Sequence, residues 1–256
     1  MVTLVKANLL RLGNIVAYVV TLAVNSLAGS STLLNGRTTA AVSDAYLTLV
    51  TPAGYVFSIW GVIYLLLGAF VVFQVLPNQK DQPYQKQIGA LFILSSLFNI
   101  VWLFLWQYDY ITLSVIVMFA FLVTLIAIYV RLGIGKTKAS LKENLLVRLP
   151  FSVYLGWITI ATIANVSAAL VSVSWDGFGL SPQTWAILVL AVAAVITLAV
   201  IVTRKDVAYS LVVIWALAGI AVKQSLYPDI VLTAEVAIAI VVVALVVTLI
   251  AYRLRR

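Results

Sequence analysis

The stretch VRLPFSVYLGWITIATIANVSAALV, from Val147 to Val171, runs for 25 residues with one charged side chain, near its start. A helix that crosses a bilayer needs about 20 mostly apolar residues, because hydrocarbon offers the backbone no hydrogen-bond partner. The whole chain has this character: 64% of its 256 residues are hydrophobic, 9% are charged, and the mean hydropathy is +1.15. The sequence therefore predicts an all-α polytopic membrane protein.

Eight stretches of this kind follow one another along the chain. Most of the connections between them are short, so we expect neighbouring spans to pack antiparallel. The predicted spans are Leu12 to Gly29, Ala53 to Leu76, Ile88 to Gln107, Ile111 to Leu132, Val147 to Val171, Gln183 to Thr203, Val207 to Val222 and Ile230 to Tyr252.

The basic residues alternate with these spans. Of the 16 Lys and Arg residues, only Arg37 and Lys223 fall in odd-numbered loops, and the rest fall at the termini and in even-numbered loops. Cytoplasmic loops carry the Lys and Arg excess, so we expect both termini to be cytoplasmic, in a prokaryotic cytoplasmic membrane. This distribution explains the net charge of +8 without any binding to nucleic acid.

The chain has neither Cys nor His, which excludes disulfides, thiolate chemistry, His-based acid–base catalysis and nearly every transition-metal site. Ionisable side chains are also missing from the middle of the spans, where proton- and ion-coupled transporters place them. The sequence thus disfavours an ion-coupled transporter and leaves an uncoupled carrier open. We expect no catalytic centre, no metal and no required cofactor.

Two connections are long. The first, Ser30 to Pro52, is polar and by the charge rule faces outward, as a lid over a binding site or as a solvated connector. The second, Gly133 to Arg148, is basic and should be cytoplasmic. A proline-bearing linker at 172–182 separates a predicted five-helix bundle at 1–171 from a three-helix extension at 183–256.

The chain has seven tryptophans, and the usual place for a membrane tryptophan is the interfacial belt, where Trp106, Trp175 and Trp185 fit. The others fit the belt less well, because three spans each carry an aromatic and polar stripe at helical spacing. The stripes are Trp60 and Tyr64 on the second span, Asn99 and Trp102 on the third, and Trp157, Ala161 and Asn165 on the fifth.

At about 1.5 Å of rise per residue, these seven side chains lie in the outer part of the bundle, from ~8 Å below the outer surface for Trp102 to ~21 Å for Trp157. Two interpretations stay open. Either the stripes line a pocket with flat aromatic walls beneath the long outer loop, or they are tight packing, with Ala161 allowing close approach and the asparagines bonding between helices.

Three segments resemble the translocator-protein family, also called the tryptophan-rich sensory or TspO/MBR proteins. TPAGYVFSIWGVIYLLLG, from Thr51 to Gly68, is similar to the entry into the family's second helix with its W-x-x-x-Y stretch. FNIVW, from Phe98 to Trp102, resembles part of its third helix. YLGWITIATIAN, from Tyr154 to Asn165, matches the fifth-helix pattern Y-L-x-W-x-x-x-A-T-x-x-N at every position. The resemblance covers about Ile15 to Val171, so the chain is similar to an enlarged relative with three further helices.

The resemblance implies a five-helix bundle that binds flat apolar molecules beneath the first loop: porphyrins, and in some members sterols or synthetic aromatic compounds. Porphyrin breakdown, associated with parts of the family, would involve Trp60 and Trp157 by the same resemblance. The chain also departs from the family, because Ala53 stands in place of the second proline and the usual tryptophan motif of the first loop is absent. Matched position by position, the residues implied to line the cavity are Trp60, Tyr64, Asn99, Trp102, Trp157, Ala161 and Asn165.

We therefore expect a membrane-embedded binding or sensory protein for a flat hydrophobic ligand. The ligand would be a porphyrin or another tetrapyrrole, or else a lipid or a carotenoid. Without His or Cys an iron-porphyrin would lack its usual axial ligands, which favours a metal-free tetrapyrrole. Two alternatives come from other classes: a carrier or permease for a small hydrophobic molecule, and an assembly partner within a larger membrane complex. A homodimer is also open, since family members often dimerise.

Overall fold

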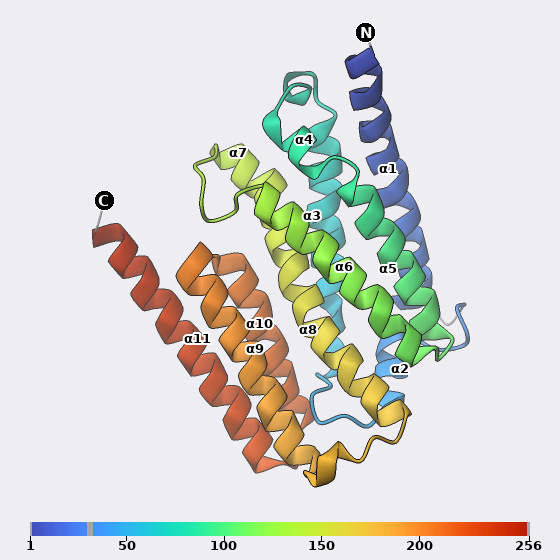
Figure 1. Cartoon of the computed structure of the whole chain (residues 1–256), viewed down its shortest axis with the longest axis vertical. Helices are drawn as coiled ribbons and strands as arrows, with labels where there is room; N and C mark the ends of the chain where they lie inside the picture. Colours follow the sequence, from blue (N-terminus) through green and yellow to red (C-terminus); the bar gives the residue numbers. More distant parts are fainter. Residues whose placement is uncertain (1, 30–32, 255–256) are drawn as a thin grey trace.

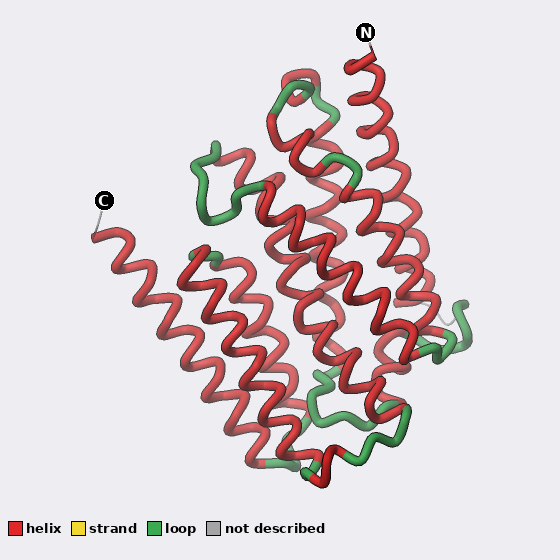
Figure 2. The backbone as a smooth tube through the Cα atoms, viewed as in Figure 1, coloured by secondary structure: helices red, strands yellow, loops and turns green. Residues whose placement is uncertain are grey.

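The computed structural model describes residues 2–29 and 33–254, with side chains from residue 8 onward. Within these ranges the regular structure is helical throughout. The eight long helices alternate in direction, so the described N- and C-terminal ends lie toward the same end of the molecule (Figures 1 and 2). They are α1 (Val2–Gly29), α3 (Ile59–Gln74), α5 (Leu91–Gln107), α6 (Ile111–Arg131), α8 (Leu149–Ser172), α9 (Pro182–Arg204), α10 (Val207–Lys223) and α11 (Pro228–Leu254).

Length and composition make this an integral membrane protein. Six helical stretches are long and apolar enough to cross a bilayer, and α5 and α10 are apolar helices of 17 residues each. The outward faces of the spanning helices carry large apolar side chains, such as Leu65 of α3 and Val195 of α9, which are 74% and 64% exposed. Such surfaces suit lipid rather than water. The predicted all-α membrane fold with about eight spans is confirmed.

Several helix limits differ from the predicted ones. Helix α1 begins ten residues before the predicted Leu12, and α5 begins at Leu91 because Gly89, at a φ of +50°, ends the short helix before it. The long first loop contains a short helix, α2 (Thr39–Ala45). The short elements are α2 (Thr39–Ala45), η1 (Gly54–Ser58), η2 (Pro77–Gln79), α4 (Pro83–Ile88), α7 (Leu141–Glu143), the π-turn η3 (Asn144–Arg148) and η4 (Gly177–Gly179).

Helix boundaries in the C-terminal part follow ordinary capping chemistry. Ser181 caps α9 by accepting a hydrogen bond from the Thr184 amide at 3.1 Å, and Pro182 occupies the first turn, where no amide donor is needed. Lys205, at a φ of +56°, ends α9, and Asp206 then caps α10 by accepting from the Tyr209 amide. A tight hairpin therefore reverses the chain at this point.

Helix α8 lies at the centre of the molecule, where it packs against α3, α6 and α10. Gly156 permits the approach to α10, because a Cβ added there would lie 3.1 Å from the Tyr209 carbonyl oxygen. Asp206, also buried, accepts hydrogen bonds from the Tyr129 hydroxyl at 2.8 Å and the Ser152 hydroxyl at 2.7 Å. The last three helices are thus held against the rest by both packing and polar contacts.

The two ends of the molecule differ in charge. We call the end with residues 33–58, 108–110, 173–181 and 223–227 the loop-1 end. The opposite end, with the described ends of the chain and residues 75–90, 132–148 and 205–206, is the basic end. Both cations of the loop-1 end are paired there, Lys223 with Asp44 at 2.9 Å and Arg37 with Asp109. The alternation of charge predicted from the sequence therefore coincides with the alternation of helix direction.

Candidate functional site

The aromatic side chains of the three predicted stripes meet around Trp60, on the first turn of α3. The Trp60 ring stacks on Tyr64, with centroids 5.6 Å apart and planes 13° apart. It also meets Trp157 of α8 edge-to-face at 6.1 Å and lies 6.4 Å from Trp102 of α5. Trp102 and Trp157 are buried, whereas Trp60 is partly exposed. Helices α3, α5 and α8 thus contribute to one continuous aromatic cluster.

The two asparagines of the stripes bond between helices. Asn99 donates to the Tyr154 hydroxyl at 3.0 Å and accepts from the Asn25 amide at 2.6 Å. Asn165 accepts from the Trp102 indole at 2.9 Å. Both asparagines are buried, so their amides already hold α1, α5 and α8 in register.

Two polar groups in this cluster retain hydrogen-bonding capacity. The buried Trp157 indole N–H has no hydrogen-bond partner, and the Tyr64 hydroxyl lies beside the Asn99 amide without reaching hydrogen-bond geometry. Buried polar groups without partners are uncommon in native proteins, and a bound water or ligand is one explanation for them. Ala161, one turn after Trp157 on α8, is partly buried and packs against the core.

A groove of about 620 Å³ opens between α1 and α3, beneath α2 at the loop-1 end. Its volume lies within the range of small-molecule sites, roughly 300–1,000 Å³. Of the seven residues predicted from the sequence, only Trp60 and Tyr64 line it; the other five lie outside its lining. The groove is lined by Tyr18, Leu22, Asn25, Ser26, Gly29, Thr39, Ala40, Gly54, Phe57, Ser58, Trp60, Gly61, Tyr64 and Leu65.

The sequence interpretation missed the contribution of α1. Its inward face carries a polar stripe at alternating spacings of three and four, and within the groove that face supplies the Tyr18 hydroxyl and the Asn25 amide. The Tyr18 hydroxyl donates to the Tyr64 carbonyl oxygen at 2.9 Å, which fixes α1 against α3. The spacing was visible in the sequence and could have indicated this face. The α1 polar stripe consists of Arg11, Asn14, Tyr18, Thr21 and Asn25.

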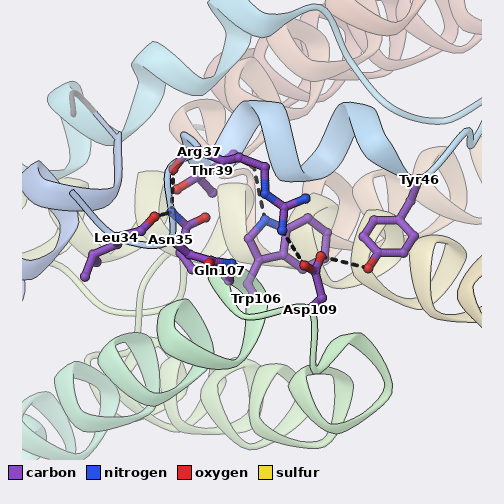
Figure 3. A network of polar contacts seen from close by, with 8 residues as sticks. All are labelled: Leu34, Asn35, Arg37, Thr39, Tyr46, Trp106, Gln107 and Asp109. Atoms are coloured by element: carbon purple, nitrogen blue, oxygen red, sulfur yellow. Dashed lines mark hydrogen bonds and ion pairs between the residues drawn. The ribbon is translucent and has the colours of Figure 1, made fainter. Parts of the chain in front are cut away.

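The first loop is fastened over the loop-1 end by the network in Figure 3. Asp109, in the turn between α5 and α6, pairs with Arg37 and accepts a hydrogen bond from the Tyr46 hydroxyl at 2.9 Å. The Gln107 side chain donates to the Arg37 carbonyl oxygen at 2.9 Å, and Asn35 donates to the Gln107 carbonyl oxygen at 2.6 Å. These four contacts make the loop an ordered cover.

Trp106 belongs to the same cover. It is 4% exposed, its indole donates to the Thr39 carbonyl oxygen at 3.2 Å, and its ring stacks on Trp102 at 5.8 Å. The expectation that Trp106 lies in the interfacial belt is therefore wrong. The first loop folds back over this residue, and the span pattern alone carries no information about that contact.

Comparison with known proteins adds one finding. A family model described as TSPO-like protein matches residues 10–248, from α1 through most of α11. No curated protein and no solved structure matches the chain. The match includes the aromatic cluster, the groove and the last three helices. The matched region spans nearly the whole length of this helical membrane protein. The chain therefore belongs to the TSPO-like protein family.

Proposed function

We propose that this membrane-embedded protein binds a flat hydrophobic ligand in the groove between α1 and α3. The observation that carries the proposal is the Trp60–Tyr64 stack, which lies in the groove with its two rings nearly parallel. Tyr64 is buried behind the partly exposed Trp60, whose ring offers a flat apolar surface suited to an aromatic or macrocyclic ligand. On the facing helix, the Asn25 N–H groups and the Tyr18 O–H already donate within the protein, so the oxygens of these two side chains are the groups that can orient such a ligand, as acceptors.

The remaining residues of the cluster support this wall. Trp157 and Trp102 pack against Trp60, and the Asn165 amide holds Trp102 in place. We infer that they act on the ligand through the position of Trp60. A metal-free tetrapyrrole is the ligand class we favour, because the chain has no His or Cys to ligate a porphyrin iron.

The test is a titration of the purified protein with metal-free protoporphyrin, followed by quenching of tryptophan fluorescence. Trp60→Leu removes the ring that faces the ligand, and since an aromatic pair contributes roughly 0.5–1.5 kcal/mol, we expect binding about tenfold weaker. The matched control is Trp175→Phe, in a separate pocket of about 210 Å³ at the start of the α8–α9 linker. Equal affinity of Trp60→Leu and the unaltered protein contradicts the proposal, as does a loss confined to Trp175→Phe.

The α1 polar stripe favours a second candidate, a carrier for a small amphipathic molecule. Arg11, Asn14 and Thr21 are all buried and each has an atom without a partner, in a helix whose outer face is lipid-exposed. A hydrogen-bonding cargo that passes between α1 and α3 would satisfy these groups in turn. Uptake of the ligand into sealed vesicles tests this function, and binding without uptake leaves the binding protein as the better account.

A further inference from the structure

Arg11 is a buried cation that forms no ion pair with any of the described side chains. Its side chain is 9% exposed, and its Nη2 atom has no hydrogen-bond partner. The ion pairs among the described side chains, residues 8–29 and 33–254, join Arg37 to Asp109, Arg148 to Glu143 and Lys223 to Asp44. Arginine is almost never buried without a paired group, because removing an ion from water carries a large energetic cost.

Two amide side chains at the same junction each have one atom without a hydrogen-bond partner. Asn14, one turn after Arg11 on α1, donates to Gln74 of α3 at 2.9 Å. That bond leaves the Gln74 Nε2 donor and the Asn14 Oδ1 acceptor unsatisfied, although Gln74 is fully buried. The junction of α1 and α3 at the basic end therefore holds a guanidinium and an amide donor, both with unused N–H groups.

Helix α4 covers this junction. Gln85 donates to the Gln74 carbonyl oxygen at 2.8 Å, and the Tyr84 ring stacks on Phe73 at 6.2 Å. Burial raises the pKa of Tyr84 to about 12, and the positive charge of Arg11 acts against that rise, which places the guanidinium near this ring. Three helices thus meet here. The carboxylate of Glu143 also acts on Tyr84, but it is paired with Arg148 and not with Arg11.

We propose that Arg11 and Gln74 bind a phosphate group at the basic end of the α1–α3 junction. The forked N–H donors of a guanidinium match the oxygens of phosphate, and the amide donor of Gln74 adds a further bond. The Asn14 oxygen can accept from a hydroxyl attached to the same ligand. Two sources supply this chemistry: the headgroup of an anionic phospholipid beside α1, or free phosphate from the aqueous side. The site is separate from the groove and does not depend on the proposed function.

The first test measures binding to delipidated, detergent-solubilised full-length protein by native mass spectrometry. The probes are phosphatidylglycerol, phosphatidylcholine and inorganic phosphate. Arg11→Gln keeps a polar side chain and removes the charge, and because a buried hydrogen bond to a charged group is among the stronger ones, we expect at least a tenfold loss of binding. Lys86→Gln removes an exposed charge at the same end and should change binding less than about twofold.

The probes distinguish the sources. Binding of phosphatidylglycerol without inorganic phosphate identifies a lipid headgroup site, and binding of inorganic phosphate alone identifies a soluble anion site. Absence of binding by the unaltered protein to any probe overturns the proposal. Equal losses in Arg11→Gln and Lys86→Gln also overturn it, since they indicate only a general attraction of anions to a basic surface.

Thermal unfolding supplies a second measurement that does not require binding to be lost. Without a phosphate ligand, Arg11→Gln should unfold at the same temperature as the unaltered protein or higher, because the variant removes an uncompensated buried charge. With phosphatidylglycerol added, the unaltered protein should gain stability and Arg11→Gln should not. A clear loss of stability in delipidated Arg11→Gln contradicts the proposal, since it means that the chain itself already compensates the charge.

Discussion

Replacement of Asn165 by leucine tests whether this side chain stabilises the packing of the helices at the aromatic cluster. The side chain is 2% exposed, accepts from the Trp102 indole at 2.9 Å, and donates to the Ser114 hydroxyl at 2.9 Å. Leucine has a similar size and makes neither bond. Ser114 retains its hydrogen bond to the Ile111 carbonyl oxygen at 2.7 Å, so the group left without a partner in Asn165→Leu is the Trp102 N–H.

The magnitude follows from two limits. An orphaned buried donor costs about 1–3 kcal/mol, whereas interhelical hydrogen bonds in membranes average about 0.6 kcal/mol and reach about 1.7. With one donor orphaned and two bonds lost, we expect Asn165→Leu to reduce the free energy of unfolding by about 2 kcal/mol. The assay is unfolding in bicelles, with Asn78→Leu as the control, since Asn78 is exposed in the connection between α3 and α5.

A double-mutant cycle locates the cause. If the loss comes from the Trp102 N–H, Trp102→Phe combined with Asn165→Leu should cost less than the sum of the two single variants, by about 0.5 kcal/mol or more. An Asn165→Leu protein as stable as the unaltered one would refute the assignment of Asn165 to interhelical bonding. Additive costs in the cycle would refute the role given to the Trp102 indole.

Three further predictions concern the contacts that fix the site. Gly219→Val should destabilise the protein by about 1–3 kcal/mol in thermal unfolding, because an added Cβ would lie 2.1 Å from a Val56 methyl group. Asp206→Ala should cost a similar amount by leaving two buried hydroxyl donors without their acceptor, and Asp206→Asn should recover part of it. The pKa of Tyr46 is raised, first by burial of its hydroxyl and then by its hydrogen bond to Asp109. The neutral Tyr46 hydroxyl therefore stabilises the fold fully below the ordinary pKa near 10, and this stabilisation is lost as pH rises through the raised value. Comparison of Tyr46→Phe with the unaltered protein across alkaline pH measures that loss, and identical profiles would contradict it.

The helical spans were predictable because hydropathy and charge act locally along the chain. Every predicted span corresponds to a long helix, and the rings of Trp60, Trp102 and Trp157, all predicted to lie in the outer part of the bundle, meet in the structure. Local pattern could not identify the partners of these residues. The asparagines bond between helices, which was one of the two open interpretations, and only Trp60 and Tyr64 line the groove.

The features that escaped prediction depend on contacts distant in sequence. The cover over the loop-1 end is fastened by the pair of Arg37 with Asp109, 72 residues away, and the same loop bonds to the buried Trp106 through Thr39. Helix α1, which packs against α3 and α5, contributes five of the fourteen residues that line the groove. The division of the chain into a five-helix bundle and a three-helix extension stays a prediction.

The most direct test of ligand binding in the groove is a substitution that fills the groove with a side chain. Gly61 lines the groove, and a Cβ added there meets no atom within 4 Å, so Gly61→Trp should fold and occupy the space that the ligand needs. Val62→Trp is the matched control, because Val62 is 51% exposed on the same helix and lies outside the groove lining. We predict that metal-free protoporphyrin binds Val62→Trp as it binds the unaltered protein and binds Gly61→Trp at least tenfold more weakly. Unchanged binding by a folded Gly61→Trp would contradict the central claim.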